Sequence, residues 1–272
     1  MTATTSSAAT TANGVVLAMR GVSKRFGAVQ ALQEIDLDVR AGEVMALVGD
    51  NGAGKSTLVK AIAGVYTPDG GSMTFDGSEA RVTSPVQAQR LGIATVFQDL
   101  ALCDNLDVVA NLFLGRELHR GRALDEVEME RVSWELLRQL SAKIPSVRIP
   151  VASLSGGQRQ TVAIARSLLG EPKLVMLDEP TAALGVAQTA EVLNLVERLR
   201  ERGLAIILIS HNMADVMAVA DRVAVLRLGR NNGVFNVSET TAQDIIAAIT
   251  GATTNAVSER AARRPNQEGQ TL

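Results

Sequence analysis

The sequence predicts an α/β fold with a mostly parallel sheet, an antiparallel β portion near the N-terminus and an inserted α-helical subdomain. Short apolar runs, of the kind found in buried parallel strands, alternate along the chain with amphipathic helical patterns. One stretch, from about residue 99 to residue 169, interrupts this alternation, because its patterns are helical and almost no strand signal occurs there. With 272 residues, the chain is long enough to bury a core as one large domain or two small ones.

The expected strands are short. Near the N-terminus, the pattern predicts strands at Val15–Met19, Ile35–Val39 and Val44–Val48. Later in the chain, four apolar runs are typical of buried parallel strands: Ile93–Val96, Leu174–Leu177, Ala205–Ile209 and Val223–Leu228.

Helices are expected between these strands. Lys55–Val65 should begin directly after a glycine-rich loop, and Val186–Arg200 has one apolar face. Asp125, followed three residues later by Glu128, resembles a capping pair that opens an amphipathic helix through Leu140.

The two ends of the chain are expected to lie outside the folded domain. Residues 1–13 are almost all Thr, Ala and Ser, and residues 253–272 are polar and charged, so we expect a disordered N-terminal tail and a flexible C-terminal tail. One domain is therefore predicted at residues 14–252, with the helical subdomain at about 99–169.

Composition excludes several classes of protein. The formal net charge is −2 and no basic stripe occurs, so nucleic acid is not expected as a main partner. The single cysteine, Cys103, cannot form an intrachain disulfide, which is compatible with a reducing compartment. No signal peptide is recognised, and the most apolar stretch, Leu204–Ile209, is far shorter than the roughly 20 residues that span a bilayer. We expect a soluble, cytoplasmic protein.

The strongest motif is a glycine-rich segment between a predicted strand and a predicted helix, where residues 49–57 fit the P-loop pattern G-x-x-x-x-G-K-[ST]. Glycines let backbone N–H groups turn inward around phosphate oxygens, and the helix N-terminus adds partial positive charge. Lys55 is expected to reach the β- and γ-phosphates of a nucleotide, and the Ser56 hydroxyl to bind Mg²⁺. The fold should therefore contain a P-loop NTPase core. The predicted nucleotide-binding residues here are Gly49, Asn51, Gly52, Ala53, Gly54, Lys55, Ser56 and Thr57.

A pair of acids follows one of the expected strands. Asp178 stands at the carboxyl end of the run Leu174–Leu177, where it could hold Mg²⁺ directly or through water. Glu179 could orient and deprotonate a water molecule that attacks the terminal phosphate. Taken alone, the pair fits two solvated acids at the start of a loop equally well. Beside a P-loop, nucleotide hydrolysis becomes the favoured interpretation.

A third motif, Leu-Ser-Gly-Gly-Gln-Arg-Gln at residues 154–160, opens a helix expected to run to about Leu169, so it is a second helix N-terminus able to bind an anion. Alone, it would be a capped helix and nothing more. Together with the P-loop and the acid pair, it resembles the signature sequence of ABC ATPases. The resemblance covers the chain from about Val15 to Gly251, with the motifs in the family order. The signature residues that it assigns to nucleotide binding are Ser155, Gly156, Gly157 and Gln158.

The resemblance assigns roles to three further residues. Phe26 matches the aromatic residue that stacks on adenine, with a Phe of the core as the plain alternative. Gln98 matches the glutamine that touches Mg²⁺ or water and links the core to the helical subdomain. His211 matches the histidine that contacts the γ-phosphate and holds the catalytic geometry. With ATP and Mg²⁺ as the implied cofactors, the expected catalytic residues are Glu179, His211 and Gln98, and the expected metal ligands are Ser56, Gln98 and Asp178.

One position departs from the family. After residues 179–181 the family usually reads Ser-Ala-Leu-Asp, whereas residues 182–185 here are Ala-Ala-Leu-Gly. The usual Asp helps one site sense the other across a dimer, and Gly185 has no carboxylate for that role. The sequence Thr-Ala-Ala-Leu-Gly at residues 181–185, together with Phe113–Glu117 upstream, is similar to the carbohydrate-importer branch of the family.

The resemblance also implies partners. The chain has one P-loop and one signature, like the single-domain members, so we expect an ATP-dependent homodimer in which the signature of one subunit closes over the γ-phosphate held by the other. An importer motor works with transmembrane permease subunits and a periplasmic or extracellular solute-binding protein. It lies on the cytoplasmic face of the inner membrane as a peripheral subunit. The implied function is ATP-driven import of a solute, with a monosaccharide as the favoured cargo.

Two other classes compete with this interpretation. A soluble ABC ATPase of DNA repair or translation usually carries long coiled-coil insertions or two fused domains, and the sequence shows neither. A kinase or GTPase with a P-loop would not explain residues 154–158, and a GTPase would need an Asn-Lys-x-Asp motif that the sequence lacks. Genes for a permease and a binding protein beside this gene would favour the importer.

The segment Asp99–Phe113, directly after Gln98, is expected to contact the permease. Its apolar content exceeds what a short helical subdomain needs, and exposed apolar patches commonly mark partner sites. In the family, this region forms the groove that receives a short permease helix. The alternative is that these side chains pack the core of the subdomain itself. The apolar residues concerned are Leu100, Leu102, Leu106, Val108, Val109, Leu112 and Phe113.

Overall fold

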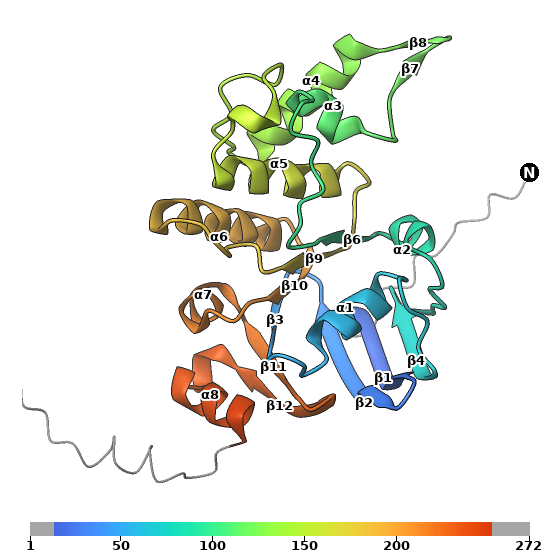
Figure 1. Cartoon of the computed structure of the whole chain (residues 1–272), viewed down its shortest axis with the longest axis vertical. Coiled ribbons are helices and arrows are strands. Elements are labelled where there is room, and N and C mark those ends of the chain that lie inside the picture. The colour runs from blue at the N-terminus through green and yellow to red at the C-terminus, as the bar shows by residue number, and fades with distance from the viewer. Residues whose placement is uncertain (1–13, 252–272) are drawn as a thin grey trace, which may run out of the picture.

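Residues 14–251 are described by the computed structural model of the chain; the tails predicted at 1–13 and 253–272 lie outside this range. Its central sheet has six strands in the order β12-β11-β3-β10-β9-β6 (Figure 1). All neighbours in this sheet pair in parallel except β11 and β12, which are antiparallel. The mostly parallel sheet is thus confirmed. Its strands are β3 (Val44–Val48), β6 (Ile93–Val96), β9 (Leu174–Asp178), β10 (Ala205–Ile209), β11 (Arg222–Arg227) and β12 (Arg230–Asn236).

A second, antiparallel sheet has the order β2-β1-β4-β5, which confirms the predicted N-terminal β portion. Two of its strands run beyond the predicted ranges, because pairing continues through polar and exposed residues up to Phe26 and Val29 at the hairpin end. Hydrogen bonds between the strands, and not burial, hold that part together, so it leaves no apolar signal in the sequence. The strands are β1 (Val15–Phe26), β2 (Val29–Arg40), β4 (Gly70–Phe75) and β5 (Ser78–Glu79).

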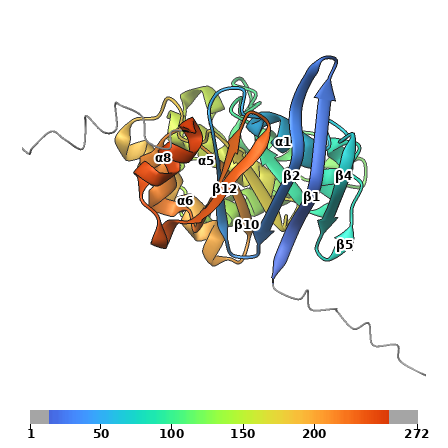
Figure 2. The ribbon, with the colours of Figure 1, turned by 90° about the horizontal axis from the view of Figure 1, so that it is seen from below.

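Two separate cores cover the two faces of the six-stranded sheet. Along β3, Met45 and Leu47 pack with the antiparallel sheet and helix α1 (Lys55–Ile62), whereas Val44, Ala46 and Val48 pack on the opposite side with α5 (Gly156–Leu168) and α6 (Val186–Glu201). Figure 2 shows this layering, with β1, β2 and β4 on one side and α5, α6 and α8 on the other. Helix α1 is shorter than predicted because Gly64, at a φ of 74°, ends it.

Residues 99–169 contain mostly helices, together with a short two-stranded hairpin that the sequence did not predict (Figure 1). Asp125 caps α4 by accepting from the backbone N–H of Glu128, as expected. The Glu128 side chain instead pairs with Arg131, so only half of the capping box forms. That this segment is a subdomain of its own stays a prediction. Its elements are α3 (Val108–Phe113), β7 (His119–Arg120), β8 (Ala123–Leu124), α4 (Glu126–Gln139), the 3-10 turn η1 (Val151–Ser153) and α5.

Several short helices were not predicted. They begin at side-chain caps, for example Ser84 before α2 and Thr241 before α8, and each is too short to show a clear apolar period. No helix within residues 14–251 is long and apolar enough to cross a bilayer. The remaining elements are α2 (Pro85–Leu91), α7 (Met213–Val219), η2 (Val237–Glu239) and α8 (Ala242–Thr250).

Candidate functional site

The carboxyl ends of β3, β10, β9 and β6 lie side by side, because these strands are parallel neighbours in the sheet. Ile209 at the end of β10 pairs with both Leu47 of β3 and Asp178 of β9, so these three strands end at one level. Ligands of open α/β sheets bind at this edge. The segments that follow the four strands carry the predicted site: the P-loop after β3, His211 after β10, Glu179 after β9 and Gln98 after β6.

The P-loop is shaped by two glycines that have no room for a side chain. A Cβ on Gly49 would collide with the carbonyl oxygen of Leu226, and one on Gly54 would lie 2.7 Å from the carbonyl oxygen of Ala31. Both glycines have positive φ angles, 150° and 103°. The Nζ of Lys55 donates to the carbonyl oxygens of Gly49, at 2.6 Å, and Asp50, at 3.0 Å. The lysine ammonium therefore sits inside the curve of the loop, where a phosphate would be bound.

Asp178 ends β9 and Glu179 follows it, at the same edge of the sheet as the P-loop. Burial raises the pKa of the Asp178 carboxyl, and the charge of Glu179 raises it further, while Lys55 and Lys60 oppose these effects. The acid pair and the P-loop lysine lie at or beyond the ends of strands that both pair with β10 and end at one level, so they lie at the same edge of the sheet. Glu179 has a φ of 51°, which is unusual for a residue with a side chain, and its N–H donates to the carbonyl oxygen of Ile209 at 2.9 Å. This strained backbone places the Glu179 side chain beside β10.

His211 meets Glu179 from the neighbouring loop. Its Nδ1 lies 2.8 Å from Oε2 of Glu179, and the exposed fractions of the two side chains are 74% and 15%. The imidazole is thus open to solvent, while the carboxylate is sheltered. Gln98 lies exposed, two residues beyond the end of β6, and no hydrogen bond within residues 14–251 ties its side chain to Glu179 or Asp178. The structure therefore brings Glu179 and His211 into contact. Gln98 lies at the same edge of the sheet but is not hydrogen-bonded to either of them.

Phe26 lies at the end of β1, with 41% of its surface exposed, so it is not a core residue. The close packing of Gly54 on Ala31 holds the β1–β2 hairpin against the P-loop. The ring of Phe26 meets the ring of Tyr66 edge to face, with 4.9 Å between centroids, and Lys24 lies 5.5 Å from the Phe26 centroid. The sequence reasoning missed Tyr66, because this contact joins residues 40 positions apart and no motif includes it.

The signature segment opens α5, a different helix from the one that follows the P-loop. Ser155 caps α5 in a full capping box with Gln158, which confirms the predicted helix start. Gly156 and Gly157 pack closely on the start of α6, near Leu184 and Gln188. Helix α5 covers the face of the sheet opposite to α1, which follows the P-loop. The two motifs thus open helices that cover opposite faces of the sheet.

Comparison with known proteins agrees with the motifs. The ABC transporter family pattern matches residues 32–182, more than half of the chain. The chain belongs to the ABC transporter family. It is 45% identical over 245 residues to a fructose import ATP-binding protein of Rhizobium meliloti, covering 87% of this chain and 94% of that protein. It is 43% identical over 235 residues to a xylose/arabinose import ATP-binding protein of Sulfolobus acidocaldarius, covering 86% of this chain and 94% of that protein.

Solved structures of ABC cassettes share the fold. The ADP conformation of an ATP-binding cassette of an ABC transporter superposes with a TM-score of 0.75 at 25% identity, covering 87% of this chain and 95% of that chain. A dimeric, post-hydrolysis cassette bound to ADP and Pi superposes with a TM-score of 0.69 at 25% identity, covering 81% and 98%. The P-loop NTPase fold and ATP hydrolysis predicted from the sequence are thus confirmed for this ABC ATPase.

The sequence predicted an exposed apolar surface on Asp99–Phe113, and this prediction was wrong for most of the seven apolar residues in that segment. Leu100 and Leu102 are partly buried and pack on the core, and Leu106 is partly buried as well. The cause is that α3 packs against both α4 and α5, which covers its apolar side chains. Four of the seven residues are fully covered: Val108, Val109, Leu112 and Phe113.

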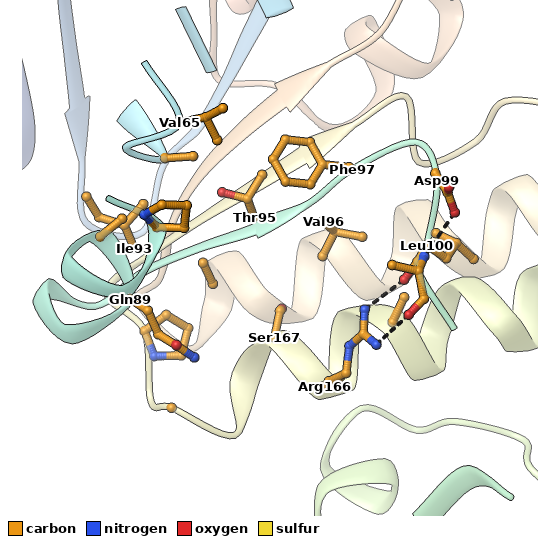
Figure 3. Close-up of a pocket in the computed structure, with 18 of the residues that line it drawn as sticks. Val65, Gln89, Ile93, Thr95, Val96, Phe97, Asp99, Leu100, Arg166 and Ser167 are labelled. Carbon is orange, nitrogen blue, oxygen red and sulfur yellow. Dashed lines mark hydrogen bonds between the residues drawn. The ribbon is translucent and has the colours of Figure 1, made fainter. Parts of the chain in front are cut away.

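A cleft of about 370 Å³ lies beside this segment, between β6, α2 and the end of α5. In Figure 3, Arg166 reaches from α5 to the segment after β6 and donates to the carbonyl oxygens of Leu100, at 2.7 Å, and Ala101, at 2.8 Å. Phe97 lines the same cleft, and Leu114 at its edge is 46% exposed. The sequence reasoning missed Leu114, because it lies just beyond the chosen segment, at the end of α3.

Proposed function

We propose that this ABC ATPase binds MgATP between two copies of the chain and uses its hydrolysis to drive monosaccharide import through a separate permease. The observation that carries the proposal is the division of the site: the P-loop, Asp178, Glu179 and His211 lie at one edge of the sheet, whereas Ser155 opens α5, which packs on the face of the sheet opposite to α1. One chain therefore holds the two halves of a composite site at different places.

Hydrolysis requires a water molecule to attack the γ-phosphorus while the bond from that phosphorus to the β–γ bridging oxygen breaks. We assign the base to Glu179, which accepts a proton from the attacking water, because its carboxylate is sheltered and faces the site. His211 orients Glu179 through their 2.8 Å contact. With ATP bound, its exposed imidazole would contact the γ-phosphate. Lys55 binds the β- and γ-phosphates after it exchanges its loop carbonyls for phosphate oxygens.

Mg²⁺ fits this donor set as a phosphate-bound ion. Within residues 14–251 no group of three or more His, Cys, Asp or Glu could hold a metal ion by itself, which suits an ion that takes few protein ligands and several from phosphate and water. Ser56, Asp178 and Gln98 are the proposed protein ligands. When bound, the ion neutralises charge on the phosphate oxygens.

The rest of the site is supplied by the partner copy. The N-terminus of α5 offers free backbone N–H groups and the hydroxyl of Ser155 to an anion. Ser155, Gly156, Gly157 and Gln158 of one copy would thus close over the γ-phosphate bound by the other. The dimeric cassette with ADP and Pi, 25% identical to this chain, supports a homodimer.

Sugar import is proposed because the chain resembles import ATP-binding proteins for fructose and for xylose/arabinose over nearly their whole length. The partners would be transmembrane permease subunits and a solute-binding protein, with this chain peripheral on the cytoplasmic face of the membrane. We propose that a permease helix binds in the cleft beside β6, since Phe97 and Leu114 offer apolar contacts there. The hydrogen bonds of Arg166 to the segment after β6 hold one side of the cleft in place.

The proposal is tested by reconstitution. The chain would be assembled in lipid vesicles with permease subunits that bind it, and uptake of labelled fructose, xylose and ribose would be measured with ATP and the matching binding protein present. ATP-dependent uptake of one of these sugars supports the proposal. ATP hydrolysis that stays unaffected by the permease and by every sugar would contradict it.

A further inference from the structure

Asp215 is a buried acid that the proposed chemistry does not use. It is the third residue of α7, and only 5% of its surface is exposed. Both carboxylate oxygens accept hydrogen bonds: Oδ2 from the Thr181 hydroxyl at 2.6 Å, and Oδ1 from the Asn212 side-chain amide at 3.0 Å. A buried carboxylate is stable only when its oxygens are bonded in this way, so Asp215 ties its two partners to one point.

The two partners belong to the two loops that carry the proposed catalytic pair. Thr181 lies two residues after Glu179, in the loop that follows β9. Asn212 comes directly after His211, in the loop that follows β10. The carboxylate of Asp215 therefore bridges the same two loops that meet at the contact between His211 and Glu179.

Helix capping alone does not explain this geometry, as the same position in α8 shows. There, Asp244 is also the third helical residue, and its Oδ2 accepts from the backbone N–H and the hydroxyl of the cap residue Thr241. In α7 the backbone N–H of the cap residue Asn212 donates to the Ser210 hydroxyl instead. Asp215 thus keeps the bond to the side chain of the cap residue but not the bond to its backbone N–H, and its second oxygen reaches across to Thr181.

His211 needs such an anchor, because burial does not hold it. Its side chain is 74% exposed, and its ring approaches Glu179 with 2.8 Å between Nδ1 and Oε2 of that residue. An exposed side chain samples several rotamers unless its backbone and partner are both held in place. The backbone bond from Glu179 to Ile209 fixes the base of the two loops, and the contacts of Asp215 fix their outer parts.

We propose that Asp215 is a positioning residue that clamps the loops at 179–181 and 210–212, so that His211 faces Glu179 in the hydrolytic geometry. The inference rests on the proposed roles of these two residues. Asp215 does not touch the nucleotide in this scheme. Loss of the clamp should therefore lower kcat and leave the KM for ATP nearly unchanged.

The first test observes His211 directly. The chain has two histidines, and His119, on the exposed strand β7, is the internal control. In side-chain NMR spectra of the full-length protein, Thr181→Val should shift or broaden the ring signals of His211 and leave those of His119 unchanged. Thr181→Ser keeps the hydroxyl and should leave both signals in place. Unchanged His211 signals in a folded Thr181→Val protein would overturn the clamp.

The second test measures steady-state ATP hydrolysis by the same variants. Thr181→Val should lower kcat at least about tenfold with KM within about twofold, since a small displacement of a catalytic group costs up to about 10²-fold. Thr181→Ser should restore turnover. Asp215→Asn replaces one acceptor oxygen by an amide donor and should lower kcat by a similar factor, and the double variant should be no worse than either single variant.

The outcomes separate the clamp from the function on which it rests. If His211→Ala loses turnover while Thr181→Val and Asp215→Asn keep it, the clamp is wrong and the catalytic pair stands. If His211→Ala keeps full turnover, the proposed role of His211 is wrong, although the NMR test still decides whether Asp215 places the ring. Effects of Thr181→Val and Asp215→Asn that multiply in the double variant would also overturn the clamp.

Discussion

The Nδ1 of His211 lies 2.8 Å from Oε2 of Glu179, across the gap between two neighbouring strands. The contact follows from register: Ile209 of β10 pairs with Asp178 of β9, so the loop residues just beyond them come to the same level. The carboxylate is 15% exposed and the imidazole 74%. A sheltered base next to a solvent-exposed imidazole suits a site that excludes water only when a second subunit covers it.

Replacing the proposed base gives the first prediction. Glu179→Gln should bind ATP with near-normal affinity and lose about 10²- to 10⁴-fold in turnover, the usual contribution of a positioned base. Because ATP persists, the variant should accumulate as an ATP-bound dimer, which gel filtration can detect. Glu201→Gln, at the exposed end of α6, is the matched control and should keep full turnover. Normal turnover in Glu179→Gln would remove Glu179 from the mechanism.

A second prediction concerns the composite site. Lys55→Ala removes the phosphate-binding lysine, and Ser155→Arg blocks the opposite wall, so each variant alone should be inactive. A mixture forms mixed dimers in which one of the two sites keeps both its lysine and its serine, and ATP hydrolysis should partly return. A covalently linked mixed dimer is the control for subunit exchange. If the linked dimer hydrolyses no ATP, the two sites act only as a pair.

The strands that the sequence predicted best are those that are buried on both faces. The ranges Val44–Val48, Ile93–Val96 and Ala205–Ile209 match β3, β6 and β10 as predicted, because strands covered on both faces are continuous apolar runs. Strand β12 was missed, because it lies at the sheet edge with alternate residues exposed. Short helices such as α7 depend on caps and tertiary contacts, which a local pattern does not reveal.

The same distinction holds for the site. Lys55, Asp178 and Glu179 belong to local motifs, so the sequence alone places them in the candidate site. Tyr66 and Asp215 contact side chains that are distant in sequence, Phe26 and Thr181 respectively, and only the packed structure brings these pairs together. An apolar segment such as 99–113 could not be divided into buried and exposed members from its composition, since that division depends on what packs against α3.

A third prediction follows from the raised pKa of Asp178. Burial disfavours its charged form, so the folded chain holds the proton to a higher pH than the unfolded chain, and ionisation costs stability. Without nucleotide, Asp178→Asn should therefore melt at a higher temperature than the natural chain at pH 7. This advantage should shrink as the pH falls through the raised pKa towards the ordinary value, below which both states are protonated. A constant difference between pH 4 and pH 8 would contradict the assignment.

A fourth prediction concerns the position where the chain departs from its family. Gly185 is the cap residue of α6, with extended backbone (φ −74°, ψ 164°), and an added Cβ would meet nothing within 4 Å. In Gly185→Asp the carboxylate can accept from the free N–H groups of the first turn and should stabilise the fold by a few tenths to about 1 kcal/mol. Thermal unfolding should shift upwards by about 1–4 °C. Gly185→Ala, which adds no acceptor, should show no such gain, and an equal shift in both variants would exclude capping.

The last prediction concerns coupling to the permease. Leu114 is 46% exposed at the edge of the cleft beside β6, whereas Leu112, two residues earlier, is fully buried in the core. Leu114→Arg should abolish ATP-driven sugar uptake in reconstituted vesicles while basal ATP hydrolysis and the melting temperature stay nearly unchanged, because the change removes an apolar contact only at the partner surface. Leu112→Ala should instead lower the free energy of unfolding by about 2–5 kcal/mol, since it leaves a cavity.

Val127 is the matched control for Leu114, because it is an apolar residue that is 82% exposed on α4 and does not line the cleft. Val127→Arg should keep full uptake, which would assign the loss in Leu114→Arg to the cleft and not to added surface charge. A fall in melting temperature in Leu114→Arg similar to that in Leu112→Ala would mean that Leu114 supports the core. Normal uptake by a stable Leu114→Arg protein would place the permease contact elsewhere on the chain.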